Sequence, residues 1–289
     1  MKNESSSHFN YMRVLIFGGT GYIGTMLSRF LVNQNYVVGN VSRTESKVNG
    51  VVNYSIKCDV YSTLDSFKPD KIIYLAACFD NNDVDEILNV NIKTPLKILN
   101  IIENIDGLEF IYTGSYWQFG DKSKPNIPID LYSTSKKAMS NFLEYYNEYT
   151  NVRCKDIVLY GSYGESDTRG KLLDYLLSSA INNEKVNLTK GEQSLNLVSV
   201  TDICLVLKDI IDGKYESNKL QLMSSRNYTP KDLVALISQY APIDVVFGTV
   251  PYRKVELMKP NTLNGYETVM IEDKIQSYIS NALNIKSVK

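Results

Sequence analysis

Short apolar runs alternate with helical periodicity along the first part of the chain. Runs typical of buried β-strands occupy residues 14–17, 36–41, 51–56, 71–77, 109–113 and 156–160. Between them, apolar residues at three- and four-residue spacing predict helices over residues 24–33, 84–102 and 132–149. Pro95 lies inside the second of these helices and should kink it. Strands that alternate with helices predict an α/β fold with a doubly wound parallel sheet.

The second half of the chain is less regular. The predicted elements are helices over residues 171–181, 200–211 and 230–240 and strands over residues 186–188 and 196–200, followed by an irregular part until residues 271–283. We interpret residues 12–165 as a nucleotide-binding domain with a return segment near residues 196–222. Residues 166–289 are mainly a smaller α/β substrate-binding lobe over the strand ends, where open α/β sheets bind ligands. Residues 1–11 are interpreted as a disordered tail, which leaves open whether translation starts at Met1 or Met12.

A glycine-rich turn joins the first strand to the first helix, with the spacing G-x-x-G-x-x-G. Helix-start amides and the helix dipole favour a phosphate there. The glycines permit a tight turn, close approach of the backbone to a pyrophosphate and close packing of helix on strand. This context predicts a Rossmann-type dinucleotide site; a turn that binds no ligand is the alternative. The expected cofactor contacts are Gly18, Thr20, Gly21, Tyr22, Ile23 and Gly24.

Composition and charge narrow the functional classes. The 289 residues are 44% hydrophobic and 22% charged, which is ordinary for a globular protein. The net charge of −1 gives no global field that would attract nucleic acid or an anionic membrane. No apolar run reaches the length of a membrane span, and the polar N-terminus lacks the apolar core of a secretory signal. We therefore expect neither a nucleic-acid partner nor a membrane partner.

Cysteine and histidine usage points to a cytoplasmic enzyme without metal. Cys58, Cys78, Cys154 and Cys204 are scattered without C-x-x-C spacing, and free thiols in a reducing cytoplasm fit them better than disulfides. The only histidine is His8, in the tail. This excludes Ser-His-Asp hydrolysis, histidine metal sites and histidine acid–base chemistry, and we expect no metal.

Tyr132 and Lys136 lie four residues apart in a predicted helix, and therefore on one face of it. An ammonium near a phenol favours phenolate and lowers the phenol's pKa. Such a tyrosine can exchange a proton with a carbonyl or hydroxyl group. The spacing alone is weak evidence, because the chain has 21 tyrosines and a surface tyrosine–lysine pair is the plain alternative. Ser115, at the end of the preceding predicted strand, favours the functional interpretation.

With these motifs the sequence resembles the extended, nucleotide-sugar-modifying branch of the short-chain dehydrogenase/reductase superfamily, over residues 12–202. The resemblance implies that Ser115, Tyr132 and Lys136 are catalytic. Tyr132 would protonate a ketone oxygen as hydride arrives, Lys136 would support it and hold the nicotinamide ribose, and Ser115 would stabilise the oxyanion. Gly120 falls where the family has a glycine after the serine. The implied cofactor contacts beyond the glycine turn are Asp59, which matches the adenine contact, and Val60, Ala76, Ala77, Asn91 and Tyr160. Asn91 matches the asparagine that kinks the following helix.

The end of the second strand bears on the choice of cofactor. It reads Ser42-Arg43 where an acid would take the ribose 2′-hydroxyl, and an arginine accommodates a 2′-phosphate. We therefore expect NADP(H) as the preferred cofactor, with NAD(H) as the alternative if Arg43 is only a surface residue.

The resemblance also indicates a reaction class. Tyr116-Trp117 stands where the 4,6-dehydratases of the branch carry an Asp-Glu pair, and the C-terminal lobe is short, as in the 4-ketoreductases. The sequence looks most like the paratose and abequose synthases, which form CDP-linked 3,6-dideoxyhexoses. The implied substrate contacts are Tyr116, Trp117, Arg169, Lys171 and Asn196. Core packing of Trp117 and solvated charges at Arg169 and Lys171 are the alternatives, and many relatives carry arginine where we align Asn196.

These observations leave three hypotheses. The first is an NADPH-dependent reductase of the 4-keto group of a nucleotide-linked deoxy sugar, for polysaccharide or O-antigen synthesis. The second is a nucleotide-sugar 4-epimerase, which would retain bound NAD. The third is a dinucleotide-binding regulator without catalysis, although such proteins usually lose the tyrosine or the lysine. A homodimer is expected because relatives pair through the helix that bears this motif and the helix before it. Ala138, Phe142 and Tyr145 fit such a contact, or burial within one chain.

Overall fold

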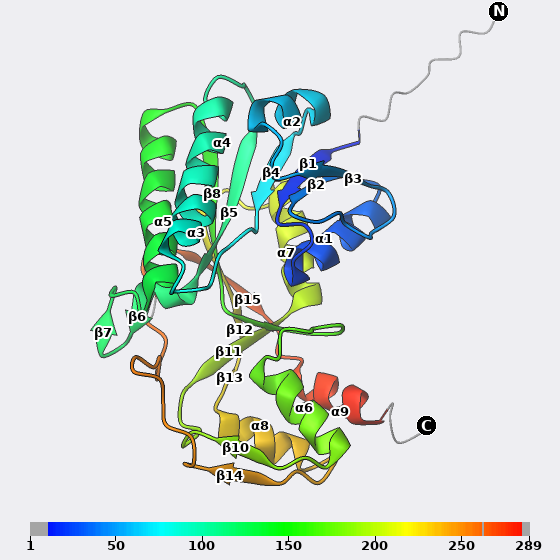
Figure 1. The fold of residues 1–289 in the computed structure, drawn as a ribbon, viewed down its shortest axis with the longest axis vertical. Coiled ribbons are helices and arrows are strands. Elements are labelled where there is room, and N and C mark those ends of the chain that lie inside the picture. Colours follow the sequence, from blue (N-terminus) through cyan, green and yellow to red (C-terminus); the bar gives the residue numbers. More distant parts are fainter. Residues whose placement is uncertain (1–10, 262, 285–289) are drawn as a thin grey trace, which may run out of the picture.

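An eight-stranded sheet forms the centre of the computed structural model, which describes residues 11–261 and 263–284 (Figure 1). Its strand order is β15-β12-β8-β5-β4-β1-β2-β3, and every neighbouring pair is parallel. The strands are β1 (Arg13–Phe17), β2 (Val37–Ser42), β3 (Val51–Ser55), β4 (Lys71–Tyr74), β5 (Glu109–Ser115), β8 (Arg153–Leu159), β12 (Lys219–Ser224) and β15 (Glu267–Ile271). The predicted doubly wound, Rossmann-type α/β fold is confirmed.

Each face of the sheet is covered by helices because successive strand residues point to opposite faces. Val14 and Ile16 of β1 pack in one core cluster with α1 (Tyr22–Asn33) and α7 (Val200–Ile211). Leu15 and Phe17 pack in the other with α2 (Val60–Phe67), α4 (Thr94–Ile102) and α5 (Leu131–Tyr149). Burial on both faces explains why the central strands are continuous apolar runs.

The helix predicted over residues 84–102 is irregular in its middle. It consists of α3 (Val84–Leu88), a π-helical turn (Asn89–Lys93) and α4, with Pro95 in the first turn of α4. Proline has no amide hydrogen, so it cannot bond to the carbonyl four residues earlier, that of Asn91. The predicted kink is therefore a π turn centred on Asn91.

Three elements of the main sheet layer escaped the sequence prediction. The helix α2 is short and is capped by Asp59, whose side chain accepts a hydrogen bond from the Ser62 amide at 3.1 Å. The strands β12 and β15 come from the irregular second half and extend the sheet beyond β8. Their register with β8 requires long-range pairing that local periodicity does not reveal. The return segment thus brings α7 and β12 back to the sheet, and β15 follows from further along the chain.

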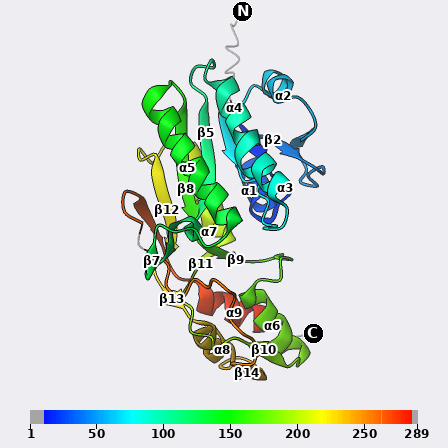
Figure 2. The ribbon, with the colours of Figure 1, turned by 60° about the vertical axis from the view of Figure 1, so that its left-hand side comes forward.

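The remaining elements form a smaller lobe next to the sheet domain (Figures 1 and 2). Its helices α6 (Leu172–Asn182), α8 (Pro230–Ile237) and α9 (Ile275–Asn284) share one hydrophobic cluster. Short strands complete it: β9 (Gly161–Tyr163), β10 (Val186–Leu188), β11 (Leu195–Ser199), β13 (Asn227–Tyr228) and β14 (Val245–Phe247). A 3-10 turn (Tyr116–Phe119) and the hairpin β6 (Gly120–Asp121) and β7 (Lys124–Pro125) follow β5. Within the described ranges no helix has the length and apolarity of a membrane span.

Candidate active site

The glycine turn between β1 and α1 has no room for larger residues at two of its three motif positions. A Cβ added at Gly24 would lie 2.3 Å from the Gly18 carbonyl oxygen, and one at Gly18 would lie 2.7 Å from the Ala76 amide nitrogen. Gly18 also has a φ of +86°, a conformation that side-chain-bearing residues rarely adopt. Gly21 is different: it caps α1, and an added Cβ would meet the Gly18 oxygen at an ordinary 3.4 Å. Space at Gly21 is therefore open toward the outside of the turn, where a phosphate would approach.

The other predicted residues of this turn connect it to its surroundings. The Thr20 hydroxyl accepts a hydrogen bond from the Thr44 hydroxyl at 3.4 Å, and Ile23 packs against the core. The Tyr22 hydroxyl donates to the carbonyl of Glu165, in the loop after β9, and the Arg169 guanidinium lies 4.2 Å from the centre of its ring. The loop before α6 thus lies directly beside the start of α1.

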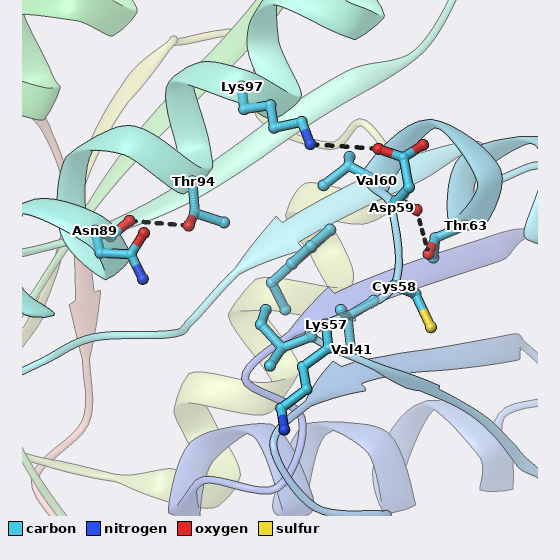
Figure 3. A pocket seen from close by; sticks show the side chains of 11 residues that line it. Val41, Lys57, Cys58, Asp59, Val60, Thr63, Asn89, Thr94 and Lys97 are labelled. Atoms are coloured by element: carbon cyan, nitrogen blue, oxygen red, sulfur yellow. Dashed lines mark hydrogen bonds and ion pairs between the residues drawn. The ribbon is translucent and has the colours of Figure 1, made fainter.

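A cavity of about 530 Å³ opens beside this turn (Figure 3). It is lined by residues from the ends of β1 and β2, the segment after β3 and the helices α3 to α4: Phe17, Val41, Ile56, Lys57, Cys58, Asp59, Val60, Thr63, Asn89, Thr94 and Lys97. Asp59 pairs with Lys97 at 3.3 Å, and the hydrogen bonds from Ser62 and Lys97 hold the pKa of its carboxyl below the usual range. The cavity lies at carboxyl ends of strands next to the β4-β1-β2 junction, where such sheets bind dinucleotides.

The end of β2 carries one buried and one exposed polar residue. The Ser42 hydroxyl is buried and donates to Asn40 Oδ1 at 2.7 Å. Arg43 is exposed and forms no hydrogen bond or ion pair with any residue of the described ranges. The Asn40 amide in turn donates to Asn53 Oδ1 at 2.9 Å, so this edge is fixed while the Arg43 side chain points to solvent.

Ala76 and Asn91 fix the segment that follows β4. The amide of Ala76 donates to the Phe17 carbonyl at 3.0 Å, and Ala77 continues the segment towards Cys78. Asn91 is fully buried; its side chain accepts from the Cys78 amide and donates to the Cys78 carbonyl, at 2.8 and 3.0 Å. Its amide also donates to the Ser135 hydroxyl on α5 at 2.9 Å. Asn91 thus joins the π turn, the loop after β4 and the helix of the tyrosine motif.

The three predicted catalytic residues are brought together at the end of β5. Tyr132 and Lys136 project from the first turns of α5. Asp130 caps this helix, and its carboxylate accepts a hydrogen bond from the Ser133 amide at 2.7 Å. Both are almost completely buried, and Ser115 is half-buried. The Lys136 ammonium donates to the Thr113 carbonyl at 2.9 Å and lies 5.9 Å from the centre of the Tyr132 ring.

The direction of the pKa shift of Tyr132 differs from the sequence expectation. Burial raises the pKa of Tyr132, and a hydrogen bond with Ser115 opposes this rise. Burial also lowers the pKa of Lys136 to about 7, with the charge of Asp156 opposing the shift. The expected lowering of the Tyr132 pKa by Lys136 is therefore not seen in the protein alone, because burial dominates both groups. The phenol stays protonated, which is the state that a general acid requires.

Aromatic rings surround the Tyr132 phenol. Phe79 is 67% exposed, and its ring centre lies 4.7 Å from that of Tyr132. Trp117 meets Tyr132 edge-on at 6.5 Å, and Tyr116 stacks on Tyr160 at 4.8 Å. The Tyr160 hydroxyl donates to Gln221 at 2.9 Å inside the fold. Of these rings, Phe79 is the one that is mostly exposed.

Cationic side chains lie near this aromatic group. Arg253, from the segment before β15, lies 5.5 Å from the Trp117 ring centre, and its charge and that of Arg169 help to lower the pKa of Lys171 after the larger effect of burial. Arg169 also forms a two-point ion pair with Asp167. Asn196 differs from these residues: it is buried, and its amide donates to the Ser224 carbonyl and to Asn227. The polar atoms of the Asn196 side chain are therefore already hydrogen-bonded within the protein, to Ser224 and Asn227.

Comparison with known proteins identifies the family. Residues 14–217 match the sequence profile of the NAD dependent epimerase/dehydratase family. The chain belongs to this family. It is 32% identical over 287 residues to a CDP-abequose synthase of Yersinia pseudotuberculosis, which covers 94% of this chain and 99% of that protein. A CDP-abequose synthase of Salmonella muenchen is 21% identical, with 95% of this chain and 98% of that protein covered.

Solved structures of the family share the fold. A UDP-N-acetylglucosamine 4-epimerase from Methanobrevibacter ruminantium M1 aligns with a TM-score of 0.77 and 18% identity, covering 96% of this chain and 99% of that one. A UDP-glucose 4-epimerase from Thermus thermophilus, solved with NAD, gives 0.74 and 17%, covering 94% and 98%. The predictions of an extended short-chain dehydrogenase/reductase and of an NAD(P)-dependent oxidoreductase are confirmed.

The residues of this family member fit the cofactor that the family name implies. The turn at Gly18 and Gly24 forms a cradle that a Cβ would fill, and the cavity beside it could hold the adenosine half. Sequence reasoning missed Phe79 and Arg253, which lie in irregular loops without periodicity. It also missed Gln118, whose S-x-x-Q spacing after Ser115 is a recognisable capping signal: Gln118 Oε1 accepts from the Ser115 amide at 3.0 Å.

Proposed function

We propose that this enzyme uses NADPH to reduce the 4-keto group of a nucleotide-linked deoxy sugar, with a CDP-4-keto-3,6-dideoxyhexose as the first candidate. The observation that carries the proposal is the placement of Tyr132 and Lys136, both buried on the first turns of α5, beside Ser115 at the end of β5. The full-length similarity to a protein named CDP-abequose synthase supports the substrate class. A role in polysaccharide or O-antigen sugar synthesis follows only from that substrate.

The proposed mechanism assigns one task to each residue. Bound NADPH would supply the hydride. Ser115 donates a hydrogen bond to the ketone oxygen, where negative charge develops. Tyr132 transfers its proton to that oxygen, which completes the alcohol. Lys136, when charged, stabilises the phenolate that remains. The buried site keeps water away from these groups, which strengthens each of these interactions.

Positions of the cationic residues support a nucleotide diphosphate as the part of the substrate that is held outside the reaction centre. The charges of Arg169 and Arg253 both act on the pKa of Lys171, so the three cations belong to one region. Arg253 also lies over the Trp117 ring, next to Tyr132. Charge-assisted contacts from such a group suit phosphate oxygens. Tyr116 and Trp117 then form the wall between the diphosphate and the sugar.

The cofactor preference is proposed from the end of β2. Arg43 is exposed there and forms no hydrogen bond or ion pair with any residue of the described ranges. Its guanidinium can therefore bind a 2′-phosphate without breaking an existing bond. Titration of purified protein with NADPH and NADH tests this. Tighter, exchangeable NADPH binding is expected, whereas tightly held NAD would favour the 4-epimerase.

We also propose a homodimer through α5. Phe142, Tyr145 and Tyr149 are 38%, 54% and 75% exposed, at three- and four-residue spacing on one side of this helix. The alternative was that these side chains are buried within one chain, but Phe142 and Tyr145 are exposed. A contiguous apolar stripe of this kind suits a protein–protein contact. A cytoplasmic location stays a prediction.

The decisive test is reduction of a CDP-4-keto-3,6-dideoxyhexose, followed by the loss of NADPH absorbance. Tyr132→Phe keeps the ring and removes the proton, and loss of a general acid lowers rates by about 10²–10⁴-fold. We expect a fall in kcat of this size with NADPH binding unchanged. Normal turnover by Tyr132→Phe would contradict the mechanism, and the absence of any turnover by the wild-type protein with this and related keto sugars would contradict the substrate.

A further inference from the structure

One face of α5 continues the catalytic stripe by a further turn. Tyr132, Lys136 and Ser140 follow each other at four-residue spacing and are all buried. The first residue meets Ser115, the second meets the Thr113 carbonyl, and the Ser140 hydroxyl donates to Asp156 Oδ2 at 2.6 Å. The third position of the stripe therefore ends on a buried carboxylate of β8.

A continuous hydrogen-bonded chain links that carboxylate to the catalytic serine. The Ser115 amide donates to Gln118 Oε1 at 3.0 Å, and Gln118 Nε2 donates to the Ser140 hydroxyl at 2.8 Å. Ser140 then donates to Asp156, which also accepts from the Tyr266 hydroxyl at 2.6 Å. Burial raises the pKa of the Asp156 carboxyl, and the two hydroxyl donors oppose this rise because they favour the ionised carboxylate.

Strand register places the same carboxylate close to Lys136. Asp156 is directly opposite Tyr112 in the β5–β8 ladder, so both side chains leave the same face of the sheet. The Lys136 ammonium lies 4.5 Å from the centre of the Tyr112 ring, on that face. Asp156 is 3% exposed, and its second oxygen, Oδ1, has no hydrogen-bond partner in the described ranges. A buried carboxylate with one unsatisfied oxygen is costly unless a charge compensates it.

The other ionisable groups near Asp156 and Lys136 do not provide an alternative to the interaction between these two charges. Asp156 is the charged group that raises the pKa of Lys136 against the effect of burial, and Tyr112 and Tyr132 are the phenols beside the ammonium. Asp156 also faces Lys219 of β12 and the Tyr266 phenol. Lys219, however, is already paired with Glu144 at the surface. Of the two cations that act on Asp156, Lys219 and Lys136, Lys136 is therefore the buried one.

We propose that Asp156 is a positioning residue for this active site: it is the buried counter-ion that keeps Lys136 charged, and through Ser140 and Gln118 it fixes the backbone of Ser115. The proposal rests on the proposed roles of Ser115, Tyr132 and Lys136. It gives a reason for a carboxylate in a sheet whose buried positions are mostly apolar, where an ordinary core residue would pack at lower cost.

The test compares Asp156→Asn with the wild-type enzyme in the pH profile of kcat for the keto-sugar reduction. Loss of the anion makes Lys136 easier to deprotonate, so the alkaline fall of kcat should move to lower pH by about one unit, the smaller end of the effect of a nearby opposite charge. Asp202→Asn is the matched control. Asp202 is also a buried acid with an unpartnered oxygen, but it lies on α7 and pairs with Lys274 at 2.7 Å, and its variant should keep the wild-type profile. A kcat lowered equally at every pH by Asp156→Asn would overturn the counter-ion role.

A second measurement separates this proposal from the proposed reaction. The pH dependence of unfolding by urea is measured for the protein with and without Lys136→Met, first in the wild-type background and then in the Asp156→Asn background. The difference within each pair reports the ionisation of Lys136 without any substrate. Its midpoint should move to lower pH when Asp156 is replaced, and an unmoved midpoint overturns the proposal whatever the enzyme reduces. If Asp156→Asn does not fold, Ser140→Ala removes one donor from the carboxylate and should shift the midpoint in the same direction by less.

Discussion

Replacement of Lys136 by methionine should stabilise the fold at low pH while it abolishes the proposed chemistry. Lys136 is 2% exposed, and burial lowers its pKa from 10.5 to about 7. A difference of this size between the unfolded and folded chain corresponds to about 5 kcal/mol that favours the unfolded state wherever both forms are charged. Methionine has a similar length, is flexible and carries no charge, so it should fill the same space without that cost.

The sign and the pH range follow from the two pKa values. Below pH 7 the lysine is charged in both states, and the folded state bears the whole cost. As pH rises above 7 the folded protein releases this proton first, so the cost decreases and vanishes above the unfolded value of 10.5. Between pH 6 and pH 9 the wild-type protein should gain about 3 kcal/mol of unfolding free energy relative to Lys136→Met. Part of the benefit of the variant is lost because the Thr113 carbonyl gives up the lysine as a hydrogen-bond donor, which costs about 1–2 kcal/mol. A further part is lost where Asp156 is ionised, because the buried carboxylate then lacks the charge of Lys136.

Urea unfolding of both proteins at pH 6 and pH 9, without cofactor, measures the difference directly. The comparison cancels the other ionisations that the two proteins share, apart from that of Asp156, whose pKa the charge of Lys136 helps to lower. Lys137→Met is the control, because the neighbouring ammonium donates to the Asn126 carbonyl at the surface and its loss should give the same difference at both pH values. A gap between wild type and Lys136→Met that does not change with pH would refute the assignment of Lys136 as a buried, reluctantly charged group.

Two further predictions concern the cofactor turn and the mouth of the site. Gly24→Ala should destabilise the turn by about 1–3 kcal/mol and abolish NADPH binding, because its Cβ meets backbone at 2.3 Å. Gly21→Ala, whose nearest contact is 3.4 Å, should fold normally and lose only cofactor affinity; urea unfolding and NADPH titration distinguish the two, and equal unfolding for both variants would contradict the packing argument. Phe79→Ala should leave the unfolding free energy unchanged, because the ring is 67% exposed, and should lower kcat/KM for the keto sugar about 10-fold through lost apolar contact. An unaltered kcat/KM would place Phe79 outside the sugar pocket.

Local sequence patterns predicted those parts of the structure that local contacts determine. The glycine turn, Asn91 and the Tyr132/Lys136 pair were all predicted from spacing and resemblance. The structure brings Ser115, Tyr132 and Lys136 together, and their catalytic roles remain proposals. The strands β12 and β15 were missed because their partners lie far along the chain. Phe79 and Arg253 were missed because exposed loops have no periodicity that would mark them as neighbours of Tyr132 and Trp117.

The protonation of the site could not have been predicted from spacing, because spacing gives proximity and not burial. A lysine four residues from a tyrosine lowers the phenol's pKa only while the lysine is charged, and burial of Lys136 works against that charge. The same burial keeps Tyr132 protonated in the protein alone. A reductase needs this order of events, because the tyrosine must hold its proton until the ketone oxygen becomes basic, and only then does a cation have to stabilise the phenolate. Asp156 suits that requirement, because its charge favours the ammonium of Lys136 and its carboxylate is held by Ser140, one turn further along α5.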